Sequence, residues 1–100
     1  MIVSIVRFRA GLTDDQVQEL YEARSDRYRD VPGLVEKLYL RYRSGEHGAV
    51  YVWENEEALD AFRASDLGGT IGAAYQVEGE PRSEIADVTL LVDRRAVQTP

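Results

Sequence analysis

Short alternating blocks of hydrophobic and polar residues predict four strands and two main helices. Residues 2–9 are rich in β-branched side chains and are apolar on both faces, which is typical of a strand. A helix is expected over residues 14–29, with Thr13 as its N-cap and Gln16 completing a capping box. Pro32 and the glycine after it then end this helix.

The middle of the chain predicts a long hairpin followed by a second helix. Residues 34–43 and 49–53 carry aromatic and β-branched side chains that favour pairing across the polar loop at 44–48. Asn55 is expected to cap the second helix. The glycine-rich run at 66–72 predicts a bend with a short irregular helix after it, and this is the segment expected to be most mobile.

The last third of the chain predicts a turn at 79–82, a final strand at 85–92 and a charged tail, Asp93-Arg94-Arg95, that frays. The resulting order is strand, helix, strand, strand, helix, strand. This order indicates the α+β class and a single domain, residues 1–100, with the ferredoxin-like split βαβ plan: a four-stranded antiparallel sheet with both helices on one face. Because the strands are apolar on both sides, we expect the open face to meet a second copy in a homodimer.

The composition of the chain argues against several classes of function. The sequence has no cysteine and one histidine, which excludes disulfides, cysteine-ligated metals and a multi-histidine metal site within one chain, and we expect no cofactor. A net charge of −6 disfavours binding to nucleic acid, so small molecules are the expected partners. No apolar run is long enough to cross a membrane, and residues 1–7 lack the features of a signal peptide, so a cytoplasmic location is expected.

Three stretches, residues 31–39, 48–54 and 57–62, resemble the small monooxygenases of the dimeric α+β barrel superfamily, which are similar to antibiotic biosynthesis monooxygenases. The resemblance extends over most of the chain, and it implies a homodimer whose two sheets form a barrel. It also implies a mostly apolar pocket between sheet and helices in each subunit. No histidine follows Trp53, where the haem-degrading branch carries its haem ligand, so the resemblance does not extend to that chemistry.

Two residues are candidates for handling a proton. His47 is the only side chain that titrates near neutrality without help, and it lies in a polar loop. It is either a solvated loop histidine or a base at a pocket mouth. Tyr75 follows the glycine-rich bend and either reaches the pocket from a flexible lid or is a packing tyrosine with an exposed hydroxyl. Glu36 and Lys37 point to opposite faces of their strand, so one of them is expected inside, and the sequence leaves open which.

Arg24 and Tyr28 continue the apolar stripe of the first predicted helix. A buried guanidinium needs an anionic partner, which is a substrate enolate or phenolate, Asp87, or a carboxylate of the other subunit. Arg24 is therefore the first choice for stabilising an anion. Tyr51 and Trp53 share one strand face and, with Tyr39 across the hairpin, form either an aromatic wall for a planar substrate or core packing.

The function that the resemblance implies is a cofactor-independent monooxygenase acting on an electron-rich aromatic or polyketide-like substrate. A base removes a proton, the anion gives an electron to O2, and the radical pair recombines. Arg24 would stabilise the anion, His47 or Tyr75 would handle the proton, and the aromatic residues, Tyr28 among them, would hold the ring. The alternatives are a polyketide cyclase or isomerase using the same pocket and a non-catalytic dimeric module that binds a small molecule.

Overall fold

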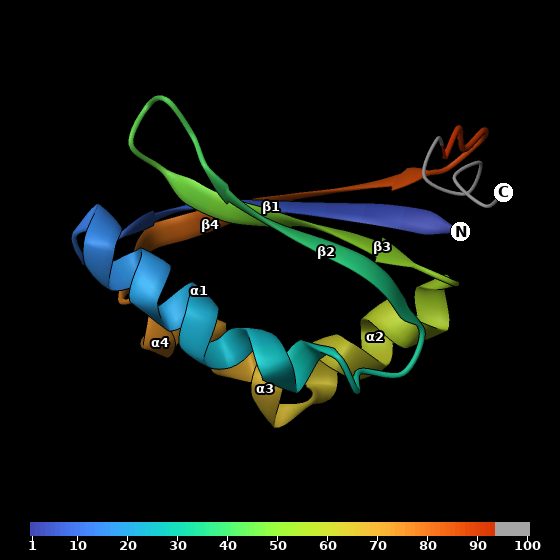
Figure 1. Ribbon diagram of the computed structural model, residues 1–100, viewed down its shortest axis with the longest axis horizontal. Helices are drawn as coiled ribbons and strands as arrows, with labels where there is room; N and C mark the ends of the chain where they lie inside the picture. Colours follow the sequence, from blue (N-terminus) through green and yellow to red (C-terminus); the bar gives the residue numbers. More distant parts are fainter. Residues whose placement is uncertain (94–100) are drawn as a thin grey trace, which may run out of the picture.

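A four-stranded antiparallel sheet forms one layer of the protein, and the helices lie on one of its faces (Figure 1). The computed structural model describes residues 1–93. In chain order the elements are β1 (Ile2–Ala10), α1 (Asp14–Tyr28), β2 (Leu34–Arg41), β3 (His47–Trp53), α2 (Glu56–Ala64), α3 (Asp66–Gly69), α4 (Ile71–Ala74) and β4 (Val77–Asp87). The predicted class, the order of strands and main helices along the chain, and the placement of the helices on one face are confirmed.

The strands lie in the order β2-β3-β1-β4, so β1 and β3 are central and β2 and β4 form the two edges. Directly opposed residues share a face, and Ser4 lies opposite Tyr51 while Ile5 lies opposite Val50. Ser4 and Tyr51 are buried under the helices, whereas Ile5 and Val50 face the open side. This register fixes the inner and outer faces that the sequence pattern left open.

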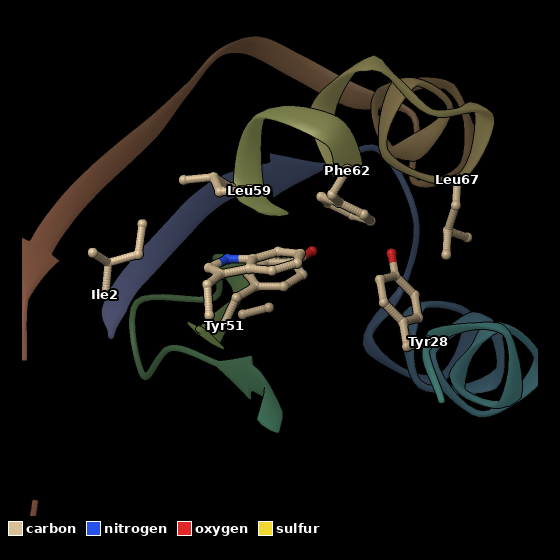
Figure 2. Close-up of a cluster of buried hydrophobic side chains, with 8 residues drawn as sticks. Ile2, Tyr28, Tyr51, Leu59, Phe62 and Leu67 are labelled. Atoms are coloured by element: carbon tan, nitrogen blue, oxygen red, sulfur yellow. The ribbon is translucent and has the colours of Figure 1, made fainter. Parts of the chain in front are cut away.

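The inner face carries most of the core. One buried cluster joins the end of α1 to β3, α2 and α3, and Figure 2 shows Tyr28 and Leu67 pointing toward each other beside Phe62 and Tyr51. Trp53 is completely buried, and its indole Nε1 donates a hydrogen bond of 3.1 Å to the hydroxyl of buried Ser4. A second cluster packs the first turns of α1 against β1 and the end of α4; its buried members are Phe8, Val17, Tyr21 and Tyr75.

The open face is apolar along its middle. Its central residues include Val3, Ile5, Val50 and Val52, which are half-buried although no helix covers them, and Leu38 on β2 is 47% exposed. A large uncovered apolar face of this kind is unusual for a monomer. The homodimer therefore remains a prediction that this face supports.

A charged group borders the apolar part of the open face. Glu46 Oε1 accepts from Arg7 Nε at 3.0 Å, and Glu46 Oε2 accepts from Arg82 Nη2 at 3.0 Å. The hydrogen bond from Arg7, helped by Arg82, lowers the pKa of the Glu46 carboxyl. These contacts tie the β2–β3 loop to β1 and β4.

Local capping explains where the helices begin. Thr13 Oγ1 accepts from the Gln16 backbone N–H at 3.2 Å, and Gln16 Oε1 accepts from the Thr13 N–H at 3.0 Å, so the predicted capping box is confirmed. Asn55 Oδ1 accepts from the Ala58 N–H at 2.9 Å, which confirms the second cap. Between α1 and β2, Gly33 has a φ of +76°, and a Cβ there would collide with that of Ala58.

The predicted turn at 79–82 is wrong, because β4 runs through it from Val77 to Asp87. The chain absorbs the turn-forming residues as a local irregularity: Gly79 has a φ of +72°, and the pairing with β1 shifts register between Arg7 and Arg9. Pro81 lacks an N–H, and an edge strand tolerates this.

The strand also ends at Asp87, five residues before the predicted end at Val92. The glycine-rich bend is present as α3 and α4, as predicted. Two residues of the predicted fraying tail, Arg94 and Arg95, lie outside the described residues. Within residues 1–93, no helix has both the length and the apolar character needed to cross a membrane.

Candidate functional site

Lys37 occupies the centre of the space between sheet and helices. It lies on β2 opposite Tyr51 of β3, and its ammonium nitrogen is surrounded by tyrosine rings. Nζ is 3.2 Å from the ring centroid of Tyr28, 4.1 Å from that of Tyr39 and 4.7 Å from that of Tyr51. Lys37, rather than Glu36, is thus the residue of this pair that points inside. We call Lys37 and these three tyrosines the lysine cage.

The environment of Lys37 favours the neutral amine. Burial first, and then the positive charge of Arg24, lower the pKa of Lys37 from 10.5 to about 6. The ion pairs within residues 1–93 do not include Lys37. Tyrosine faces attract an ammonium group, but they do not replace the hydrogen bonds that it makes with water. At pH 7 the cage therefore holds a free amine.

Arg24 extends from α1 to α3 and to Thr70, the residue that follows α3. Its Nη2 donates to the Leu67 carbonyl at 3.1 Å and to Thr70 Oγ1 at 3.4 Å. Its Nε is buried without a hydrogen-bond partner, and its Cζ is 5.8 Å from the Tyr75 ring centroid. Asp87 lies exposed on β4, so the prediction of Asp87 as the partner of Arg24 is wrong. Within the described chain, Arg24 bonds to neutral oxygens only.

The tyrosine hydroxyls around this interior stay protonated at neutral pH. Burial is the largest cause that raises the pKa values of Tyr39, Tyr51 and Tyr75 above the usual 10. Tyr39 Oη is buried and has no hydrogen-bond partner, whereas Tyr21 Oη donates to the Leu40 carbonyl at 2.9 Å. Tyr39 therefore has a buried hydroxyl with an unused donor.

Tyr75 directly follows α4, and only 3% of it is exposed. Its ring lies 5.6 Å from those of both Phe8 and Tyr21. In this structure Tyr75 belongs to the core, on the same side of the interior as Arg24. Tyr75 also lines the small cavity described next, so it both packs in the core and borders the interior space.

The interior contains a small cavity that shares three lining residues with a larger cleft. The cavity has a volume of about 20 Å³ and is lined by Lys37, Tyr28, Tyr39 and seven apolar or aromatic neighbours from the sheet and helices, with Gly48 completing the lining. The same lysine and the same two tyrosines also line a cleft of about 430 Å³ between α1 and β2, which includes Ser25 and Glu36. About 20 Å³ is room for one water molecule, so a planar ligand enters only if side chains move aside.

His47 lies apart from this cavity. It begins β3 and is 3% exposed, so the interpretation as a solvated loop histidine is wrong. The reason is its register opposite Phe8, which turns it to the inner face. Its Nε2 lies 3.1 Å from Asp14 Oδ1, at ion-pairing distance but without hydrogen-bond geometry, and it lines a separate pocket of about 390 Å³ at the start of α1.

The aromatic wall exists, and its members differ in access to the cavity. Tyr51 and Trp53 stack with centroids 5.7 Å apart and an interplanar angle of 11°, and Phe62 packs on both. Tyr28, Tyr39 and Tyr51 line the cavity, but Trp53 does not. The structure thus brings Tyr75 and three of the four predicted substrate-binding residues together around the cavity. Arg24 lies beside it, with its Cζ 5.8 Å from the Tyr75 ring centroid, and His47 and Trp53, like Arg24, are not part of the cavity lining.

Sequence reasoning left open whether Lys37 or Glu36 faces inside, and it gave Lys37 no role in the site. A signal was available, because Lys37 is the only lysine in the sequence, and every other basic residue among the 12 is an arginine. Lys37 also shares a strand face with Tyr39 two residues later, which makes that face the more aromatic of the two. Within residues 1–93, no group of three metal-ligating side chains is arranged to hold a metal ion.

No family model matches the sequence, and no curated protein matches it at the sequence level. Solved structures match over almost the whole chain. A protein of unknown function from Nitrosomonas europaea is 12% identical with a TM-score of 0.76, each chain being covered to 91%. The ActVA-Orf6 monooxygenase of Streptomyces coelicolor, solved in complex with nanaomycin D, is 21% identical with a TM-score of 0.72, covering 91% of this chain and 89% of that one.

SnoaB, a cofactor-independent oxygenase from Streptomyces nogalater, is 14% identical with a TM-score of 0.72, covering 91% of this chain and 95% of that one. TM-scores of 0.72 to 0.76 establish a shared architecture, whereas identities of 12% to 21% leave the activity open. The chain therefore has the fold of the antibiotic biosynthesis monooxygenase structures, the fold that its sequence resemblance predicted.

Proposed function

We propose that the protein is a cofactor-independent monooxygenase acting on an electron-rich aromatic or polyketide-like substrate. The observation that carries this proposal is Arg24, a half-buried cation in no ion pair within residues 1–93 and with a buried, unpartnered Nε. Such a group attracts an anion from outside the chain. A phenolate or enolate, formed from the substrate next to a cavity lined with aromatic rings, fits both features.

The proposed reaction begins with removal of a proton from the substrate. The resulting anion, held by Arg24, gives an electron to O2, and recombination forms a carbon–oxygen bond. For an anthrone, the CH2 group becomes a carbonyl and the second oxygen atom leaves as water. Tyr28, Tyr39 and Tyr51 would contact the ring, and the protonated hydroxyl of Tyr75 would donate a proton to reduced oxygen.

His47 has a more distant role in this scheme. It is separated from the cavity by Tyr21, whose ring lies 6.4 Å from that of His47 and 5.6 Å from that of Tyr75. If His47 is the base, it would therefore accept the substrate's proton indirectly, from the separate pocket near Asp14 and through a group that lies between the two sites. The conformations that admit substrate would displace the α3–α4 segment, which carries Leu67 and leads into Tyr75.

We infer that the functional unit is a homodimer. The apolar open face of the sheet, with Ile5, Val50 and Leu38 along it, would be covered by the same face of a second copy, in the barrel arrangement that the resemblance implies. Glu46 with its two arginine partners would lie at the border of that interface.

The experiment is dissolved-oxygen uptake by metal-stripped protein given anthrones, quinols and catechols, with mass spectrometry of the products. The wild type is compared with Arg24→Met and with Arg27→Met, a matched loss of an exposed arginine from the same helix. We expect uptake with one oxygen atom added to the product, strongly reduced in Arg24→Met and unchanged in Arg27→Met. Product formation without uptake would favour the cyclase or isomerase, and binding without any product would favour the binding module.

A further inference from the structure

We propose that Lys37 is a carbonyl-reactive amine that forms an imine with a planar aldehyde or ketone entering through the cleft between α1 and β2. This function goes beyond the proposed oxygenase and requires no O2. It would make the lysine cage a covalent binding or catalytic site.

The geometry supports both access and selectivity. Lys37 lines the 430 Å³ cleft on one side and the inner cavity on the other, so a molecule in the cleft meets the amine before it meets the core. Tyr28 and Tyr39 border both spaces, and their rings would pack against a flat, apolar carbonyl compound. The cleft has room for a single-ring or two-ring molecule, whereas the closed cavity does not.

The electrostatic setting supports a nucleophilic amine. Lysines become nucleophiles when they are desolvated in an apolar pocket or placed next to another cation, and Lys37 has both features. The charged and titratable groups around it are Arg24 and Tyr28 of α1, Tyr39 of β2, Tyr51 of β3 and, in the lining of the same cavity, Tyr75 after α4. Arg29 and Glu36 line the cleft on the other side. Among all these groups, the positive charge of Arg24 is the one that disfavours an ammonium at Lys37.

The proposed step is balanced without an oxidant or reductant. The Nζ lone pair attacks the carbonyl carbon, a C–N bond forms, and the carbonyl π electrons move to oxygen, where Arg24 stabilises the charge. Proton transfer from nitrogen to oxygen gives a carbinolamine. The Tyr39 hydroxyl, buried and without a partner, donates a proton to the departing hydroxyl group, so that water leaves, the C=N bond forms and Nζ returns a proton to Tyr39.

The test uses the fact that the chain contains a single lysine, so Lys37 and the α-amino group are its only amines. The full-length protein is incubated at pH 7 under nitrogen with 2-hydroxybenzaldehyde and sodium cyanoborohydride, and the adducts are assigned by peptide mass spectrometry. The same reaction in urea, where the chain is unfolded, gives the reactivity of an ordinary lysine. The rate at Lys37 is normalised to that of the α-amino group in each condition.

We expect Lys37 to react at least about tenfold faster in the folded protein than in urea at pH 7, because far more of the amine is unprotonated there. This advantage should shrink as the pH rises toward 9. Tyr39→Phe, which keeps the ring and removes the hydroxyl, should slow modification at Lys37 and leave the α-amino group unaffected. In Lys37→Arg only the α-amino adduct should form.

Two results would overturn the proposal. The first is a rate at Lys37 that is no faster in the folded protein than in urea, which would mean that the cage is a sealed packing arrangement. The second is an advantage that is the same at pH 7 and pH 9, which would mean that the environment does not activate the amine. Because the assay excludes O2, its failure would leave the oxygenase proposal standing, and its success would not depend on that proposal.

Discussion

Replacing Lys37 with methionine is predicted to stabilise the protein, and the gain should depend on pH. Methionine fills a similar volume among the three tyrosine rings without carrying an ionisable group. In the wild type, the pKa of Lys37 is about 6 when folded and returns to 10.5 when unfolded. Between these values the unfolded chain binds one more proton than the folded one, so wild-type stability rises with pH.

The magnitude follows from the size of the shift. The slope contributed by Lys37 is about 1.4 kcal/mol per pH unit between pH 6 and pH 10.5, and the full penalty, present below pH 6, is about 6 kcal/mol. At pH 7 the penalty is about 4–5 kcal/mol relative to strongly alkaline solution. A cost of this order is large compared with the total stability of a 100-residue domain, which is about 5–15 kcal/mol.

The assay is urea unfolding followed by the fluorescence of Trp53, the only tryptophan, at pH 6.5, 7.5 and 8.5. The stability of Lys37→Met minus that of the wild type should be positive at pH 6.5 and fall by about 1.4 kcal/mol for each pH unit. Arg9→Met, which removes an exposed cation from β1, controls for net charge and should show no such slope. Parallel pH profiles for wild type and Lys37→Met would refute the reasoning, because they would mean that the aromatic rings hold the ammonium as well as water does.

Two further predictions concern the core and the open face. Ser4→Ala leaves the buried Trp53 Nε1–H without a partner and should cost about 1–3 kcal/mol, against less than about 0.5 for Ser83→Ala on exposed β4, as measured by urea unfolding. A loss in Ser4→Ala no larger than in Ser83→Ala would contradict the importance of that hydrogen bond. Val50→Asp, in the middle of the open face, should convert dimers to monomers in analytical ultracentrifugation, whereas Ala23→Asp on the exposed side of α1 should not. A wild type that sediments as a monomer would reject the dimer.

The elements set by local chemistry were predictable from the sequence. The capping box of Thr13 and Gln16 and the cap at Asn55 act within four residues, so their sequence pattern and their geometry coincide. The strand β4 shows the opposite case. Gly79 and Pro81 favour a turn locally, but pairing with β1 keeps the chain extended and absorbs the irregularity as a shift in register.

Predicting which residues form the candidate site required the strand register more than the residue types. Alternation showed that either Glu36 or Lys37 had to face inward, but only the pairing of Lys37 with Tyr51 decided between them. His47 has a polar neighbour on one side and glycine on the other, which favours a loop, yet its position opposite Phe8 buries it. Arg24 was placed correctly by the periodicity of its helix, whereas its actual partners, Leu67 and Thr70, come from a segment more than 40 residues away.

The two edges of the sheet differ in how open they are to further strand pairing. The free edge of β4 carries Glu78, Glu80, Arg82 and Glu84 with Pro81 among them, which is a combination that discourages another strand from joining. The free edge of β2 has no proline and fewer charged residues, Glu36, Lys37 and Arg41, among its leucines and a tyrosine. Any added strand, whether a docked peptide or a copy of this chain during aggregation, should therefore join beside β2, and charged substitutions along that edge would be the first means of keeping the protein dispersed at high concentration.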